Sequence, residues 1–250
     1  MKTGERIIEE MTGMASAEEA AHLMRFFKTG KGEYGEGDRF LGIRVPATRA
    51  LVRRYRHEVA LCDMDPLLSS EWHEIRLAGL LLLVELFREA RKCGDDAGQK
   101  CIVEYYIAHI HCCNNWDLVD LSCSYILGEY VSDHMDRTDI LLELARDNRI
   151  WHRRTGIVST WALIREGKLD MTFTIAAEQL DHTHDLIHKA TGWMLREAGK
   201  RDIEALRSFL DRYVSVMPRT TLRYAIEKMS PGERAHYLSI PRAKKTVTRQ

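Results

Sequence analysis

The sequence lacks the marks of several common protein classes. No apolar run approaches the roughly 18 residues of a membrane-spanning helix, and the N-terminal MKTGERIIEEMTGM is charged where a signal peptide is apolar. The six cysteines form no CxxC pair, which favours free cytoplasmic thiols over a disulfide framework or zinc knuckle. Nucleotide-binding loops of the GxxxxGKS/T or GxGxxG type are absent, and WHEIR at 72–76 only approaches the zinc motif HExxH.

Charge is balanced overall but unevenly distributed. The 250 residues are 45% hydrophobic and 30% charged, an ordinary globular composition that suffices for one large domain or two small ones. Residues 1–145 hold 17 Lys and Arg against 25 Asp and Glu, whereas residues 146–250 hold 20 against 12. The basic second half suggests an anionic partner such as nucleic acid, although charged helix surfaces also serve solubility.

Apolar residues recur with helical spacing along most of the chain, and no convincing strand alternation interrupts them. Helices are expected over 76–91, 156–167, 186–200 and 230–238. The leucine-rich first of these predicts a helix covered on more than one side. Gly167 and Gly199 are suitable helix ends, and Ser230 with Pro231 and Glu233 predicts a capping box.

The predicted fold is all-α, with HEAT-like helical repeats forming a curved α-solenoid. Helices this short depend on neighbours for stability, which suits a layered array, and an irregular helical bundle is the alternative. We expect one domain over 1–240 and a basic, disordered tail over 241–250. The glycine-rich segment 29–43 is expected to be non-helical.

The stretch NNWDLVD, residues 114–120, places a carboxylate beside an indole. Asn114 and Asn115 suit a helix start, and Asp117 suits its first turn. Asp120 follows Trp116 by four residues, so the two side chains share a helix face although Asp is a poor helix former there. Either Trp116 is a core aromatic with Asp120 at the surface, or an aromatic wall holds a carboxylate that orients a ligand.

An arginine cluster lies in RDNRIWHRRTG, residues 146–156. With Asn148 as the expected helix N-cap, Arg149 and Arg153 lie one turn apart and Arg154 points further round. Cations near a helix N-terminus are disfavoured by the dipole, and a bound phosphate would resolve this. The alternative is pairing with a neighbouring acid, Glu143 or Asp147.

Two further patterns in the second half are ambiguous. Trp193 follows Gly192, which permits close backbone approach, but a tryptophan on an apolar helix is usually core. His184 and His188 have a metal-compatible spacing, with His182 and Asp185 nearby, yet the remaining ligands of a metal site are not evident. Cys112, Cys113 and Cys123 are expected to be buried small hydrophobes.

Taken together, several segments resemble one family, the AlkD-like DNA alkylation repair enzymes, which are HEAT-like-repeat alkylpurine DNA glycosylases. The likeness runs in order over most of residues 20–238, and the combination of WDxVD, WxRR and GWxLRE is specific. The matching segments are FLGIRVPATRALV (40–52), HEIRLAGLLLL (73–83), NNWDLVDLSCSYILGEYV (114–131), WHRRTGIVST (151–160), IHKATGWMLREAGK (187–200) and PRTTLRYAIEKM (218–229).

The resemblance implies a role for particular residues. It places the catalytic aspartate at Asp120, the two site tryptophans at Trp116 and Trp193, and a backbone-contacting arginine at Arg154. Where relatives can present a tyrosine to DNA from the N-terminal helix, this chain offers Phe26 or Phe27. The family is metal-independent, so the resemblance gives the histidine pattern no support as a metal site.

The function that follows is hydrolysis of N3- or N7-alkylated purines from duplex DNA, leaving an abasic site for base-excision repair. Asp120 would stabilise positive charge developing on the sugar, with Trp116, Trp193, Arg154, Arg153 and Arg149 contacting the DNA. The resemblance implies no cofactor, metal or membrane. It also implies that a concave face of the solenoid binds the DNA backbone and need not extrude the base. We expect a cytoplasmic monomer. The alternatives are a non-catalytic HEAT-like module that binds DNA structures or a protein, and a scaffold that binds only proteins.

Overall fold

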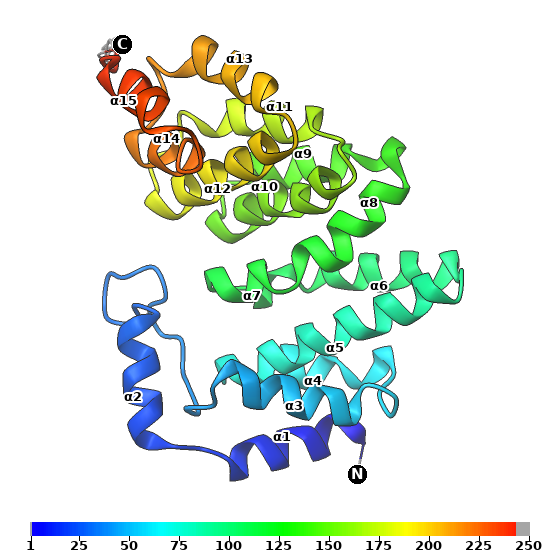
Figure 1. Cartoon of the computed structure of the whole chain (residues 1–250). Helices are drawn as coiled ribbons and strands as arrows, with labels where there is room; N and C mark the ends of the chain where they lie inside the picture. Colours follow the sequence, from blue (N-terminus) through cyan, green and yellow to red (C-terminus); the bar gives the residue numbers. More distant parts are fainter. Residues whose placement is uncertain (1, 244–250) are drawn as a thin grey trace, which may run out of the picture. The chain divides into compact units, whose positions relative to one another are not determined.

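The computed structural model describes residues 2–243, and every regular element in that range is helical (Figure 1). An isolated bridge pairs Arg39 with Trp72. The prediction of an all-α, helical-repeat fold is confirmed, because helices close in sequence pack on one another within each part of the chain. Among the described helices, none is long and apolar enough to cross a membrane.

The chain divides into two compact units, residues 1–130 and 131–250. Unit 1 is built around the long helix α5, against which α3, α4 and α6 pack. A π-helical turn, η3, precedes α8, which reaches the boundary between the units. The elements are α1 (Thr3–Gly13), α2 (Ala17–Phe26), α3 (Val45–Tyr55), η1 (Leu61–Asp63), α4 (Asp65–Leu68), α5 (His73–Lys92), α6 (Asp96–Ala108), η2 (Ile110–Cys112), α7 (Trp116–Asp120), η3 (Ser124–Gly128) and α8 (Glu129–Asp133).

Unit 2 is a layered set of helices in which α10 packs on α9 and α11, and α12 packs on α10, α13 and α14. Its core includes Leu195, Leu206 and Phe209, contributed by α12 and α13. The elements are η4 (Met135–Arg137), α9 (Asp139–Arg146), α10 (Ile150–Arg165), α11 (Asp170–Gln179), α12 (Asp185–Arg201), α13 (Ile203–Tyr213), α14 (Arg219–Ala225) and α15 (Pro231–Ser239).

Helix α5 confirms the helix expected over 76–91 and extends it at both ends. The residues from His73 to Val84 are all buried, so this part of the helix is covered on more than one side, as its leucine run predicts. The buried stretch begins with His73, Glu74 and Arg76, three polar side chains that need partners inside the protein.

The glycine-rich segment expected over 29–43 is non-helical, as predicted. The carboxylate of Glu74 anchors its end, accepting the backbone N–H groups of Leu41, Gly42 and Ile43 at 2.9, 2.8 and 3.0 Å. Gly42 has a φ of +89°, which L side chains rarely adopt. The chain therefore enters α3 in a conformation set by one buried acid of α5.

Helix ends agree with the sequence in part. The capping box of Ser230 and Glu233 is present, and Gly167 follows α10 with a φ of +74°. Two expected boundaries are wrong. Gly199 lies inside α12, where its missing side chain makes room for Leu206. The N-cap of α10 is Arg149 and not Asn148, and the Asp147 side chain accepts the Arg149 N–H. A disordered tail was expected over 241–250, and residues 244–250 lie outside the described residues.

At Gly192 the helices α12 and α14 approach each other closely. A Cβ atom added there would lie 2.5 Å from the Thr221 carbonyl oxygen and 2.5 Å from the Tyr224 Cβ. Gly192→Ala is therefore expected to destabilise the protein by about 1–3 kcal/mol, because backbone on both helices must shift. Urea unfolding of the variant and of Gly232→Ala, whose added Cβ meets nothing within 4 Å, is the measurement. Equal stability of the two variants would contradict the prediction.

Candidate functional site

Helix α7 carries Trp116 and Asp120 at its two ends. Its N-cap is Asn115, whose side-chain oxygen accepts the Trp116 N–H at 2.9 Å and whose amide donates to the Phe27 carbonyl at 3.5 Å. The helix has only five residues, so Asp120 is its last residue and not, as the sequence suggested, a position in a longer helix. A helix this short has little stability of its own, so its tertiary contacts fix both side chains.

Trp116 and Asp120 line the same cavity of unit 1, which has a volume of about 520 Å³. Trp116 is half-buried and stacks on Phe27 with ring centroids 5.4 Å apart, while Phe26 lies edge-on at 6.1 Å. The side chain of Phe26 stays 57% exposed. Further apolar lining comes from Leu23, Phe40, Ile43, Val45, Pro46 and Leu77.

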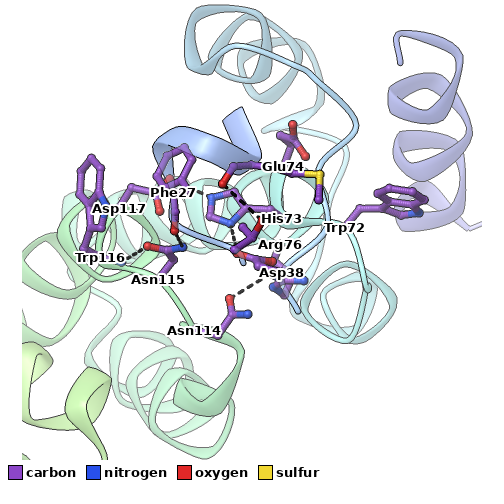
Figure 2. A network of polar contacts seen from close by, with 12 residues as sticks. Phe27, Asp38, Trp72, His73, Glu74, Arg76, Asn114, Asn115, Trp116 and Asp117 are labelled. Atoms are coloured by element: carbon purple, nitrogen blue, oxygen red, sulfur yellow. Dashed lines mark hydrogen bonds and ion pairs between the residues drawn. The ribbon is translucent and has the colours of Figure 1, made fainter. Parts of the chain in front are cut away.

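A chain of buried polar contacts supports the start of α7 (Figure 2). His73 Nδ1 lies 2.7 Å from Asp38 Oδ2, and His73 Nε2 lies 2.9 Å from Asp117 Oδ2. Arg76 donates to Asp38 Oδ1 at 2.5 Å and to the side-chain oxygen of Asn114 at 2.9 Å. The network thus joins the glycine-rich segment, α5 and the residues that begin α7.

His73 is a buried cation in this network. Both of its ring nitrogens face carboxylate oxygens, and an imidazolium, with a proton on each nitrogen, can donate to both. Burial alone would lower the pKa of His73, but the charges and hydrogen bonds of Asp117 and Asp38 outweigh it and raise the pKa to about 9. Burial likewise opposes ionisation of Asp38, and the adjacent His73 and Arg76 nevertheless lower the pKa of that carboxyl.

Asp117 is the link between this network and the cavity. It is 4% exposed, and within residues 2–243 nothing donates a hydrogen bond to its second oxygen, Oδ1. Within the same residues, the hydrogen-bond partner of the Asp117 carboxylate is therefore His73, which contacts Oδ2. A first-turn aspartate was expected here for the helix dipole, but the structure gives Asp117 a tertiary role that the local pattern does not contain.

Sequence reasoning missed Asp38, His73, Arg76 and Asn114 as parts of the site. The available signal was HEIR at 73–76, which was interpreted as an incomplete zinc motif and as part of the family-like segment 73–83. Polar residues at the start of a leucine-rich helix are buried when that helix is covered on all sides, and buried charges require partners. That argument predicts a network but does not identify Asp38, which lies 35 residues before His73.

The three arginines predicted as a site have different environments in unit 2. Arg149 is exposed and pairs with Asp147 at 2.5 Å, which is the pairing alternative that the sequence left open. Arg153 donates to the carbonyls of Arg146 and Asp147 at the end of α9. Arg154 is buried and donates to the Leu186 carbonyl at 2.7 Å, in the first turn of α12.

Trp193 and the nearby histidines also lie on or near α12. Trp193 is half-buried, so it is neither a fully enclosed core residue nor a free surface one. His184 caps the helix by accepting the Leu186 N–H at 3.2 Å, and His188 donates to the His182 carbonyl at 2.6 Å. Among the described residues, no group of three or more potential ligand side chains is arranged to hold a metal ion. Among the described residues no disulfide is formed, and Cys112, Cys113 and Cys123 are buried as predicted.

Comparison with known proteins gives two findings. Residues 7–229 match the model of a family described as DNA alkylation repair enzyme. A solved structure, a predicted DNA alkylation repair enzyme from Enterococcus faecalis, aligns with a TM-score of 0.67 and 16% identity over 87% of this chain and 97% of that chain. At this identity the structural likeness establishes the fold alone. No curated protein matches the chain significantly.

Proposed function

The chain belongs to the DNA alkylation repair enzyme family, which assigns it a role in repairing alkylation damage, and we propose that it is a monofunctional DNA glycosylase. The proposed substrates are N3-methyladenine and N7-methylguanine in duplex DNA. The products are the free base and an abasic site, which base-excision repair then processes. The reaction uses water and the chain's own side chains, and we propose that it takes place in the cytoplasm.

The observation that carries this proposal is the pairing of Asp120 with Trp116 on one largely apolar cavity. Walls of this kind exclude water, and a fixed carboxylate then exerts a stronger field on a neighbouring positive charge than it would in bulk solvent. The indole face next to it attracts cations as well. The two side chains therefore suit a sugar that becomes positively charged.

The chemistry needs one carboxylate. An N3- or N7-alkylated purine is already cationic, so it leaves with the electron pair of the glycosidic bond and becomes neutral without help from a general acid. Positive charge then develops on the deoxyribose, where Asp120 stabilises it and positions or deprotonates the attacking water. The water oxygen forms the new bond to the sugar, and its proton is lost to Asp120 or to solvent.

For unit 2 we propose DNA contacts without base recognition. Arg154 would hold a backbone phosphate, and Trp193 would contact a deoxyribose. Arg149 and Arg153 have partners within the unit, as Arg154 has in the Leu186 carbonyl, and we propose that they contribute positive charge near the strand. Such contacts give affinity that depends on salt and little on sequence.

The test is to incubate the purified protein with duplex DNA that contains N7-methylguanine and to measure free base and abasic sites. Release of the base with the strand left intact is the expected result, and undamaged duplex is the control. Tight, salt-sensitive DNA binding without base release would instead support the non-catalytic helical module. Absence of both base release and salt-sensitive binding would support a protein-binding scaffold.

A further inference from the structure

A second cavity of unit 1 adjoins the one that holds Asp120. It has a volume of about 290 Å³ and is lined by α3, α5 and the segment after α7. Leu121, the residue that follows Asp120, lines both cavities. The second cavity therefore shares a lining residue with the cavity that holds the proposed catalytic carboxylate. The first cavity has mainly apolar walls, whereas arginines dominate the second.

Four arginines line this cavity, and we refer to them as the arginine pocket: Arg49, Arg53, Arg56 and Arg88. One acid faces them, Glu85, which pairs with Arg88 at 2.8 Å and with Arg56 at 3.7 Å. Within residues 2–243, Arg49 and Arg53 have no ion-pair partner. The pocket thus combines four positive charges with a single negative one.

This arrangement is unfavourable for the protein alone. Arg49 and Arg53 are one turn apart on α3, a spacing at which like charges destabilise a helix. Their setting is unusual too, because residues 1–130 hold 16 Lys and Arg against 21 Asp and Glu. In an acidic unit, four arginines around one cavity are not explained by general surface composition. A bound anion would offset their mutual repulsion.

We propose that the arginine pocket binds a phosphodiester of the DNA backbone beside the nucleotide whose sugar reaches Asp120. The proposal rests on the proposed function for the identity of its ligand. Guanidinium groups form paired hydrogen bonds with phosphate oxygens. The unpaired Arg49 and Arg53 are the phosphate ligands.

The other two arginines hold the pocket in shape. The Arg88 guanidinium lies over the Tyr125 ring, 5.2 Å from its centroid, and donates to Glu85. Arg56 is tied to Glu85 and to His57. These contacts hold both guanidinium groups near Glu85 on one side of the cavity. Tyr125 follows α7 by five residues, which places this support in the same segment as Asp120.

The experiment measures duplex DNA binding by fluorescence anisotropy at several salt concentrations. The variant is Arg49→Gln with Arg53→Gln, and the matched control is Arg54→Gln, which removes the same kind of charge from α3 but pairs with Glu10 outside the pocket. The slope of log affinity against log salt is expected to fall by about 1–2 in the double variant. In the control the slope is expected to stay at the wild-type value.

The loss should be equal for alkylated and undamaged duplex, because a phosphate contact carries no information about the base. An unchanged slope in the double variant would overturn the proposal. The proposal would also fail if inorganic phosphate raised the melting temperature of the wild type but not of the double variant, while both proteins had the same DNA slope. The pocket would then bind a free phosphate compound. A reduced slope in a protein that releases no base would keep the arginine pocket and reject the glycosylase.

Discussion

Asp120→Asn is expected to lower the rate of base release by about 10²–10³-fold, while fold and DNA affinity stay at wild-type values. Asparagine has nearly the same size and can still accept a hydrogen bond, but it has no charge with which to stabilise the cationic sugar. Asp120 is half-buried at the end of α7, outside the His73 network, so its replacement leaves the network intact. The change therefore isolates the charge itself.

The measurement is single-turnover release of N7-methylguanine, together with thermal unfolding and anisotropy with the same duplex. Asp136→Asn is a suitable control, because that residue is an exposed acid of η4 and has no place in the proposed site. Full activity in Asp120→Asn would remove Asp120 from the mechanism. A loss of activity accompanied by an equal loss of DNA affinity would assign it to binding instead of catalysis.

Much of the fold could be predicted because it depends on local sequence patterns. The leucine spacing of α5 and the Ser230 capping box involve residues within a few turns of one another, and both appear as expected. The errors occur where a residue of another element determines the local structure. Gly199 was expected to end α12, but it gives space to Leu206 of α13, a packing need that no helix-end pattern expresses.

The candidate site could be predicted only in part. The four-residue spacing of Trp116 and Asp120 predicts a shared face, and the two residues do line one cavity. Trp193 and Arg154 were noticed in local patterns, but their roles at the site come from the family resemblance, since the local pattern of a site tryptophan matches that of a core one. The roles of all four in DNA binding or catalysis stay predictions.

The polar support of the site could not be read from the sequence. Asp38 lies in a glycine-rich segment, His73 begins a buried helix and Asp117 begins a five-residue one. Each has a sufficient local explanation, as a loop acid, a polar helix start or a dipole-compensating aspartate. Only the packing of three segments, separated by 35 and 44 residues, makes them one network.

That network gives the second large prediction. His73→Gln is expected to reduce the free energy of unfolding at pH 7 by about 3–5 kcal/mol, because it leaves two buried carboxylates without the cation between them. A glutamine side chain can donate a hydrogen bond to one aspartate, but it has no positive charge to offset the two carboxylates. Base release should fall as well, since the start of α7 loses its attachment to α5. Urea unfolding at neutral pH measures the first effect.

A double-mutant cycle separates the charge pairing from general damage to the core. Asp117→Asn removes one of the two carboxylates that His73 faces, so the double variant should be less destabilised than the sum of the two single variants. Tyr55→Phe is the comparison, because it deletes a part-buried hydrogen bond to Glu10 in the same unit without touching α7. Its effect should add to that of His73→Gln.

The pH dependence of stability follows from the raised pKa of His73. A group whose pKa is higher in the folded chain stabilises it fully below the unfolded value, 6.5, and this contribution is lost as pH rises through about 9. The difference between those two values corresponds to roughly 3 kcal/mol. The lowered pKa of Asp38 acts in the opposite direction and only in acid, as pH falls below its ordinary value of 3.8.

Wild-type protein is therefore expected to lose stability between pH 6.5 and about 9 relative to His73→Gln, which has no imidazolium to lose. Urea unfolding of both proteins across this range gives the comparison, and tyrosine or lysine titration cancels because both chains share it. Parallel stability curves would mean that His73 is neutral in the folded protein. One of the two aspartates would then hold the proton, and α7 would be attached by a neutral hydrogen bond in place of an ion pair.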